Sequence, residues 1–334
     1  MSISTNSAKV CDLTNGRIVF NTETMVALAG SNQIHAAITD ATNAVHEFSA
    51  DISGGELGFN RASLPDPIRS FKIFRASDGQ TIFEAQNLFP TTDREFEAQF
   101  KSHRDRSGDP YVDYFVASQI FDHFRGQEGY RISAAVVVAY KAIELLNAAY
   151  LEAAESRLRQ ALSAIPKVKL ARSTRNNREH LHISVLCALY HVQLARGDAA
   201  GFVQTIMTLK GLLENHSFES YYNLAYNGCL SLRLLTLLQV LAGQREAART
   251  TATLSFDVFK RACGDADENL AHFKELRYVH DNTYETMRIA RRVKDVSESL
   301  IDKTLGNCLR VSAEKHPDSS RIMQATYLES TQII

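Results

Sequence analysis

Residues 134–166 read AAVVVAYKAIELLNAAYLEAAESRLRQALSAIP and predict two helices that fold back on each other. Apolar residues recur at helical spacing in both halves, at Val138, Ala142, Leu145 and Leu146 and then at Leu151, Ala154, Leu158, Ala161 and Leu162. Pro166 ends the second helix, because proline cannot donate the helical hydrogen bond and clashes with the preceding turn. The small side chains of Ala154 and Ala161 let two helix backbones approach closely.

Two later stretches have the same layout of helix, short break and helix. The breaks lie near Ala149, Gly197 and Gly243, which are 48 and 46 residues apart. Glycine suits the end of a helix, because it adopts the left-handed conformation there without steric penalty. Self-similarity at this period predicts stacked helical hairpins, each too small to bury its own apolar face.

The second half of 134–166 resembles the second helix of a tetratricopeptide repeat. Ala154, Leu158, Ala161 and Pro166 occupy the small, large, small and proline positions of that motif. The first half departs from it, since Lys141 stands where a leucine is expected, and the period exceeds the roughly 34 residues of the standard repeat. The resemblance implies antiparallel hairpins stacked as a right-handed array, whose groove binds a segment of a partner protein.

The first part of the chain differs in pattern and predicts a small mixed α/β module over residues 1–108. Its clearest signal is a β-hairpin at 71–85, where Asp78 and Gly79 form the turn between two apolar runs. Residues 17–20 suit a short strand, 34–48 suit either a strand or a helix, and 53–66 suit a loop. Thr92 to Glu95 match a capping box that opens a helix.

The helical-hairpin domain is then expected over residues 109–334, because RDRSGDP at 104–110 breaks the preceding helix. A helix at 267–279 follows the hairpins. Residues 284–311 predict one long terminal helix with an apolar stripe, which either caps the array or packs on a second copy of the chain. A homo-oligomer is therefore possible.

Composition predicts a cytoplasmic protein in a reducing compartment. The 37 Lys and Arg residues balance 38 Asp and Glu residues, so no overall field favours nucleic acid or an anionic membrane. The cysteines are odd in number and scattered, at Cys11, Cys187, Cys229, Cys263 and Cys308. Cys187 and Cys229 sit in apolar helical patterns and are interpreted as core residues. No signal peptide is expected, and the apolar run 134–140 is too short to span a bilayer.

The motif search predicts no catalytic residues, no metal site and no cofactor. It does single out 167–178, where five cations and no acid occur within twelve residues. This stretch is either a solvated loop or a docking site for an acidic protein segment or a nucleic-acid backbone. The partner-binding candidates are Lys167, Lys169, Arg172, Arg175 and Arg178.

Within this stretch, Arg175 and Asn176 followed by His180 or His182 resemble the Arg-Asn-x(n)-His motif of HEPN-type ribonucleases. That resemblance implies that the arginine and a histidine handle the scissile phosphate and the reacting oxygens.

Three hypotheses follow for the function. The favoured one is a non-enzymatic protein-interaction scaffold that binds a partner segment in the groove of the helical array. The second is a nucleic-acid-binding or HEPN-like ribonuclease subunit that uses residues 167–182. The third is a structural protomer of a larger assembly. No membrane association is expected in any of them.

Overall fold

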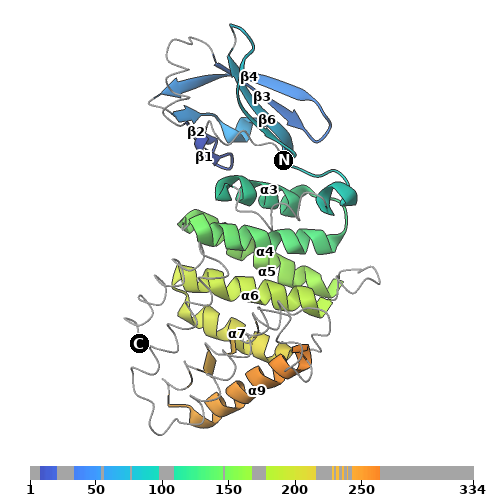
Figure 1. Cartoon of the computed structure of the whole chain (residues 1–334), viewed down its shortest axis with the longest axis vertical. Helices are drawn as coiled ribbons and strands as arrows, with labels where there is room; N and C mark the ends of the chain where they lie inside the picture. The colour runs from blue at the N-terminus through green and yellow to red at the C-terminus, as the bar shows by residue number, and fades with distance from the viewer. Residues whose placement is uncertain are drawn as a thin grey trace. The chain divides into compact units, whose positions relative to one another are not determined.

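The structure is a computed structural model of the whole chain. It describes residues 8–20, 34–53, 56–75, 77–97, 109–145, 147–167, 178–215 and 243–263, together with isolated positions between 228 and 239. The chain divides into two compact units, Met1–Lys141 and Ala142–Ile334. Figure 1 shows strands in the first unit and helices in the described part of the second. The domain boundary after residue 108 stays a prediction.

The first unit contains an antiparallel β structure. Its strands are β1 (Ala8–Asp12), β2 (Arg17–Phe20), β3 (Ile34–Asp40), β4 (Val45–Ser53), β5 (Glu56–Gly58), β6 (Ile68–Arg75) and β7 (Thr81–Gln86), in the order β1-β2-β5-β4-β3-β6-β7. The first part of β4 pairs with β3 and its last residues pair with β5, so β4 belongs to two adjoining sheets.

Alternating burial explains why these segments form strands. In β3, Ile34, Ala36 and Ile38 are buried, and the residues between them are half-buried. On the buried side, Phe71 stacks on Phe59 with the ring centres 5.2 Å apart. These two aromatic side chains therefore pack against each other on that side of the sheet.

The predicted hairpin is confirmed, since β6 and β7 pair across a turn in which Gly79 has a φ of +70°. The ambiguous stretch 34–48 forms two strands, β3 and the start of β4, and the expected loop 53–66 contains β5. The described part of 1–108 holds these strands, a 3-10 turn at Arg61–Ser63 and a helical turn at 93–97. The described part of the module is therefore antiparallel β structure, and the helical part of the expected mixed α/β module stays a prediction.

The capping box is confirmed in part. The Thr92 hydroxyl accepts a hydrogen bond from the Glu95 amide, as expected. The Glu95 carboxylate accepts mainly from the amide and hydroxyl of Thr91, and the Thr92 amide makes a smaller contribution. These hydrogen bonds stabilise the ionised form and lower the pKa of Glu95.

Helix α3 (Pro110–His123) anchors the β structure. Asp109 caps its first turn, and Pro110 follows at the position where a missing N–H is harmless. One Asp109 oxygen also accepts from the Cys11 amide of β1 at 3.2 Å. Farther along, the buried Gln119 side chain accepts from the Ile68 amide at 2.6 Å and donates to the carbonyls of Ile68 and Leu88. Two side chains of one helix thus hold two distant strands.

Helix α4 (Glu128–Leu145) follows and is linked to α3 by two charged contacts. Lys141 forms an ion pair with the buried Asp113, with a nitrogen–oxygen distance of 3.2 Å. Arg131 donates to the Phe121 carbonyl at 2.8 Å. Because both contacts reach the buried helix α3, they orient α4 as well as stabilise it.

The second unit contains α5 (Ala148–Ala164), the 3-10 turn η2 (Ile165–Lys167), α6 (Arg178–Arg196), α7 (Ala199–Leu213) and α9 (Arg245–Cys263). α6 contacts both α5 and α7, and Figure 1 shows the three helices as successive layers. The small residues Ala154 and Ala161 are buried, as the sequence predicts. These alanines therefore lie in the packed interior of the helical unit.

The predicted breaks are borne out at Gly197 and Gly243, whose φ angles are +72° and +71°. The first break lies slightly earlier than expected, at Asn147, whose side chain caps α5 and accepts from the amides of Ala149 and Tyr150. The predicted helices at 267–279 and 284–311 lie outside the described residues. The repeat array and its right-handed stacking stay predictions.

Candidate functional site

Most of the predicted basic docking stretch lies outside the described residues. This applies to Lys169, Arg172, Arg175 and Asn176. Lys167 ends η2 and Arg178 begins α6, and both are exposed. The structure thus places the two ends of the stretch, and its role in docking stays a prediction.

The two histidines of the ribonuclease hypothesis lie near the start of α6. His180 and His182 are two residues apart, so their side chains leave the helix in directions about 200° apart. Burial lowers the pKa of His182, which favours its neutral imidazole. Since Arg175 lies outside the described residues, the predicted pairing of arginine and histidine stays untested. In the described part of the chain, no group of three or more His, Cys, Asp or Glu residues could hold a metal ion.

The cysteine interpretation is confirmed for Cys187. Its side chain on α6 is buried, and burial raises its pKa to about 12. Burial also raises the pKa of Cys11. Both side chains are therefore neutral thiols at physiological pH, and a neutral thiol is a poor nucleophile. Cys229, the other predicted core cysteine, lies outside the described residues.

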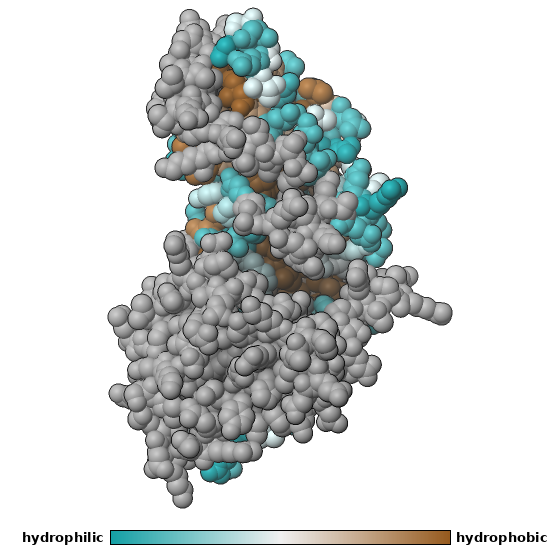
Figure 2. Space-filling model, in the orientation of Figure 1, coloured by the Kyte–Doolittle hydropathy of each residue, from teal (hydrophilic) through white to brown (hydrophobic). Residues whose placement is uncertain are grey.

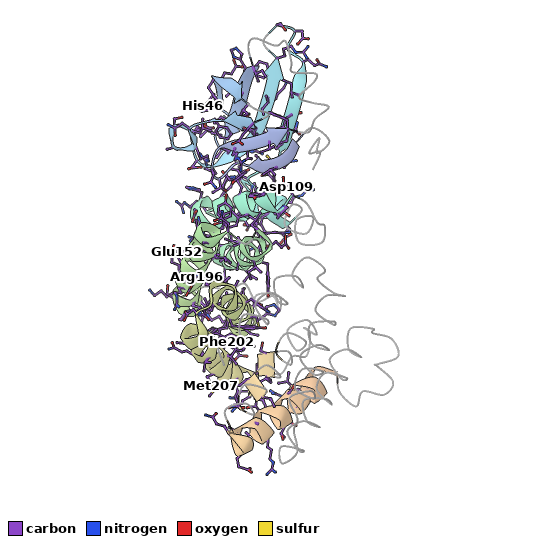
Figure 3. All side chains as sticks on the ribbon, turned by 90° about the vertical axis from the view of Figure 1, so that its left-hand side faces the viewer. His46, Asp109, Glu152, Arg196, Phe202 and Met207 are labelled. Carbon is purple, nitrogen blue, oxygen red and sulfur yellow. The ribbon has the colours of Figure 1, made fainter. Side chains whose placement is uncertain are left out.

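A buried carboxylate joins α5 and α6. Glu155 is 5% exposed, and Arg159 of the next turn donates to it at 2.6 and 3.0 Å. Arg196, at the end of α6, binds the other carboxylate oxygen. Figure 3 shows Glu152 and Arg196 on the same side of the helical unit. Both Glu155 oxygens are used in these contacts, so the cluster stabilises the packing of α5 on α6.

The solvent side of the β3–β6–β7 sheet carries mixed charges. The ring of His35 lies 5.8 Å from that of Phe74, and Lys72 lies over the Phe74 ring. Lys72 is paired in register with Glu84. Figure 2 shows a mainly hydrophilic surface, with small hydrophobic areas, over the described part of this unit. This is the ordinary surface of a solvated sheet.

The exposed side of α7 is different, and we call it the α7 face. It consists of Ala200, Val203, Gln204, Met207, Thr208 and Gly211. Val203 and Met207 are 44% and 48% exposed, and they account for two of the three large hydrophobic residues that are exposed in the described chain. None of the six residues is charged. Figure 3 shows Met207 at the outer side of the helical unit.

The neighbouring helices α5 and α9 expose charged side chains. The exposed residues of α5 include Glu152 and Arg159, and those of α9 include Glu246, Arg249 and Asp257. Charged side chains at exposed helix positions keep a surface solvated. The α7 face is therefore an uncharged strip in a unit whose other described helices expose charges.

The sequence contains a signal for this face. Val203 and Met207 are four residues apart, so they lie on one side of a helix, while Phe202, Ile206 and Leu209 form the buried side. A helix that is apolar on both sides has either two buried sides or one side available to a partner. Only the burial of each residue distinguishes these cases.

Comparison with known proteins adds no further guide to function. No family model matches the chain, and neither the curated proteins nor the solved structures yield a significant match. No helix in the described ranges is long and apolar enough to cross a membrane.

Proposed function

We propose that this protein is a non-enzymatic protein-interaction scaffold and that the α7 face is a contact surface for its partner. The single observation that carries the proposal is the uncharged, exposed position of Val203 and Met207 on a well-packed helix. Exposed apolar residues that cluster on one element indicate an interaction site more often than scattered ones do. In this proposal the helical hairpins stack as a tetratricopeptide-like array that presents the face.

Full burial of a Val or Met side chain contributes about 1.5–3 kcal/mol, and Val203 and Met207 are each close to half-exposed. Covering both would therefore contribute roughly 2 kcal/mol to binding. A charge introduced in the same place would be left unpaired in the contact, which costs several kcal/mol.

The test replaces both residues, as Val203→Glu together with Met207→Glu, in the full chain. Proteins that co-purify from native extract are compared between wild type and variant by quantitative mass spectrometry. The matched control is Thr250→Glu with Thr253→Glu, because these two α9 residues are also exposed. We expect the α7 variant to lose its specific partners while the control keeps them. Equal retention by both variants would contradict the proposal.

The basic stretch provides the competing explanation. Replacing Lys169, Arg172, Arg175 and Arg178 by serine removes four of its cations. If the α7 face binds the partner, this variant keeps most of its affinity at physiological salt. Electrostatic docking would instead weaken steeply with added salt, because each phosphate or carboxylate contact depends on counterion release or screening. Loss of affinity with an intact fold would favour the nucleic-acid or acidic-segment hypothesis.

A further inference from the structure

We infer that a buried hydrogen bond between a glutamine and a threonine closes two helical hairpins of the second unit, and that Gln193 accepts this bond from Thr205 in the hairpin of α6 and α7. The bond fixes the register of the two helices. It lies in the interior of the unit, so it does not depend on whether the α7 face binds a partner.

The hydrogen bond is present in the hairpin that α9 completes. The hydroxyl of Thr251 on α9 donates to the Oε1 atom of Gln239 at 2.8 Å, and both residues are buried. Gln239 lies four residues before the left-handed Gly243, and Thr251 lies eight residues after it. The hydrogen bond therefore connects the two sides of this turn from inside the core.

The same two residue types recur around Gly197 with the same spacing. Gln193 lies four residues before this glycine and Thr205 lies eight residues after it, so each is 46 positions from its counterpart. The two glycines have φ angles of +72° and +71°. In both turns the glutamine carbonyl accepts from the amide five residues later, at 2.9 Å around Gly197 and at 2.8 Å in the second turn. The two turns therefore have the same local geometry.

Burial repeats with the same offset of 46 residues. Of the six residues of the α7 face, five have an exposed counterpart on α9, and only Thr208 has a buried one, Leu254. On the buried side, Phe202 and Leu209 of α7 correspond to residues of α9 that are also buried. Thr205 therefore has the same place in its hairpin as Thr251 has in the next.

Gln193 has a buried oxygen that such a bond would satisfy. Its side chain is 1% exposed, and its Oε1 atom has no hydrogen-bond partner in the described part of the chain. A buried acceptor without a partner destabilises a fold, and most such groups in native proteins are paired. Thr205 is also buried, and its hydroxyl can rotate toward an acceptor. A hydrogen bond from Thr205 would give this hairpin the contact that Thr251 makes in the other.

A buried hydrogen bond specifies register more strictly than apolar contacts do. Ridges of apolar side chains can pack in several arrangements, whereas a buried donor and acceptor are both satisfied in only one. The α4–α5 hairpin has other residues at the positions 46 earlier, namely Asn147 and Arg159. Asn147 caps α5, and Arg159 binds Glu155. The glutamine–threonine pair therefore belongs to the two hairpins that turn at a left-handed glycine.

The test is a double-mutant cycle in the full chain, with hydrogen exchange of peptides from α6 and α7 as the measurement. Thr205→Val removes the hydroxyl and keeps the shape, so it should speed exchange about tenfold by leaving Gln193 unpaired. Gln193→Met combined with Thr205→Val should exchange more slowly than Thr205→Val alone, because no buried polar group is then left unpaired. Without the bond, Gln193 is already unpaired in wild type. Thr205→Val would then leave exchange unchanged and Gln193→Met would slow it, and either result would overturn the inference.

The described hydrogen bond provides the positive control. Thr251→Val, alone and together with Gln239→Met, should give the same pattern in peptides from α9. Thr208→Val is the negative control and should leave exchange unchanged, because this exposed hydroxyl donates to the Gln204 carbonyl within α7. If Thr205→Val does not fold, recovery of the fold in the double variant with Gln193→Met would support the inference. A double variant that also stays unfolded would overturn it.

Discussion

Gln119 offers the sharpest test of how the first unit is held together. This side chain is 4% exposed and makes three hydrogen bonds, one from the Ile68 amide at 2.6 Å and two to the Ile68 and Leu88 carbonyls at 3.3 and 3.2 Å. It connects α3 to the start of β6 and to the segment after β7.

The expected loss in the free energy of unfolding when Gln119 is replaced follows from these contacts. A buried backbone group that loses its partner costs about 1–3 kcal/mol. Gln119→Met keeps most of the volume and removes the hydrogen bonds, so we expect a loss of about 2–4 kcal/mol in the free energy of unfolding. Gln119→Ala adds a cavity and should lose a further ~1–2 kcal/mol. Either value is a large fraction of the ~5–15 kcal/mol that stabilises a typical domain.

The assay must report on the first unit separately, because the chain forms two compact units and a single two-state analysis does not hold for such proteins. The sequence contains no tryptophan, so hydrogen exchange of peptides that cover β6 is the preferred measurement. Gln160→Ala, on the exposed side of α5, is the control and should change stability by less than about 0.5 kcal/mol. The same exchange in β6 for Gln119→Met and for wild type would refute the reasoning.

Further predictions concern packing, turns and pH dependence. Ala154→Leu should overpack the helix contacts of α5, where the alanine is fully buried, and lower the free energy of unfolding by about 1–3 kcal/mol; an unchanged thermal midpoint would contradict this. Gly197→Ala should lower the free energy of unfolding by about 1 kcal/mol, measured by thermal unfolding, because φ is +72° at this position. A gain in stability would contradict the left-handed conformation of this residue. Burial raises the pKa of Asp109, so its contribution to stability decreases as pH rises from about 4 through the folded-state pKa. Asp109→Asn keeps an N-cap and should become progressively more stable than wild type over that range of pH, whereas parallel stability–pH curves would refute the assignment. Burial lowers the pKa of His182, so the contribution of its neutral form to the free energy of unfolding is lost as pH falls below about 6.5. His182→Gln should therefore lose less stability than wild type below that pH. The same dependence of unfolding free energy on acid pH in both proteins would contradict this.

Much of the helical unit follows from the sequence because its determinants are local. The apolar spacing around Ala154, the stop at Pro166 and the turn at Gly197 each depend on residues within a few turns of one another. The hairpin turn at Gly79 is local in the same way. Strand pairing is not, since β4 lies between β3 and β5 and β2 pairs with β5 across a long stretch of chain. The sequence pattern therefore indicated the hairpin and the strand at 17–20, left 34–48 ambiguous, and suggested a loop at 53–66, where β5 lies.

The sequence by itself determined the positions of the described helices around the two glycine turns and the burial of the packing alanines, because each depends on the periodicity of nearby residues. Only the tertiary structure decided that Gln119 and Asp109 hold the strands and that Arg196 reaches Glu155, since these partners are far apart in the chain. It also decided which apolar side of α7 is exposed. Periodicity identifies the sides of a helix, but only the packing of other elements determines which of them remains in contact with water.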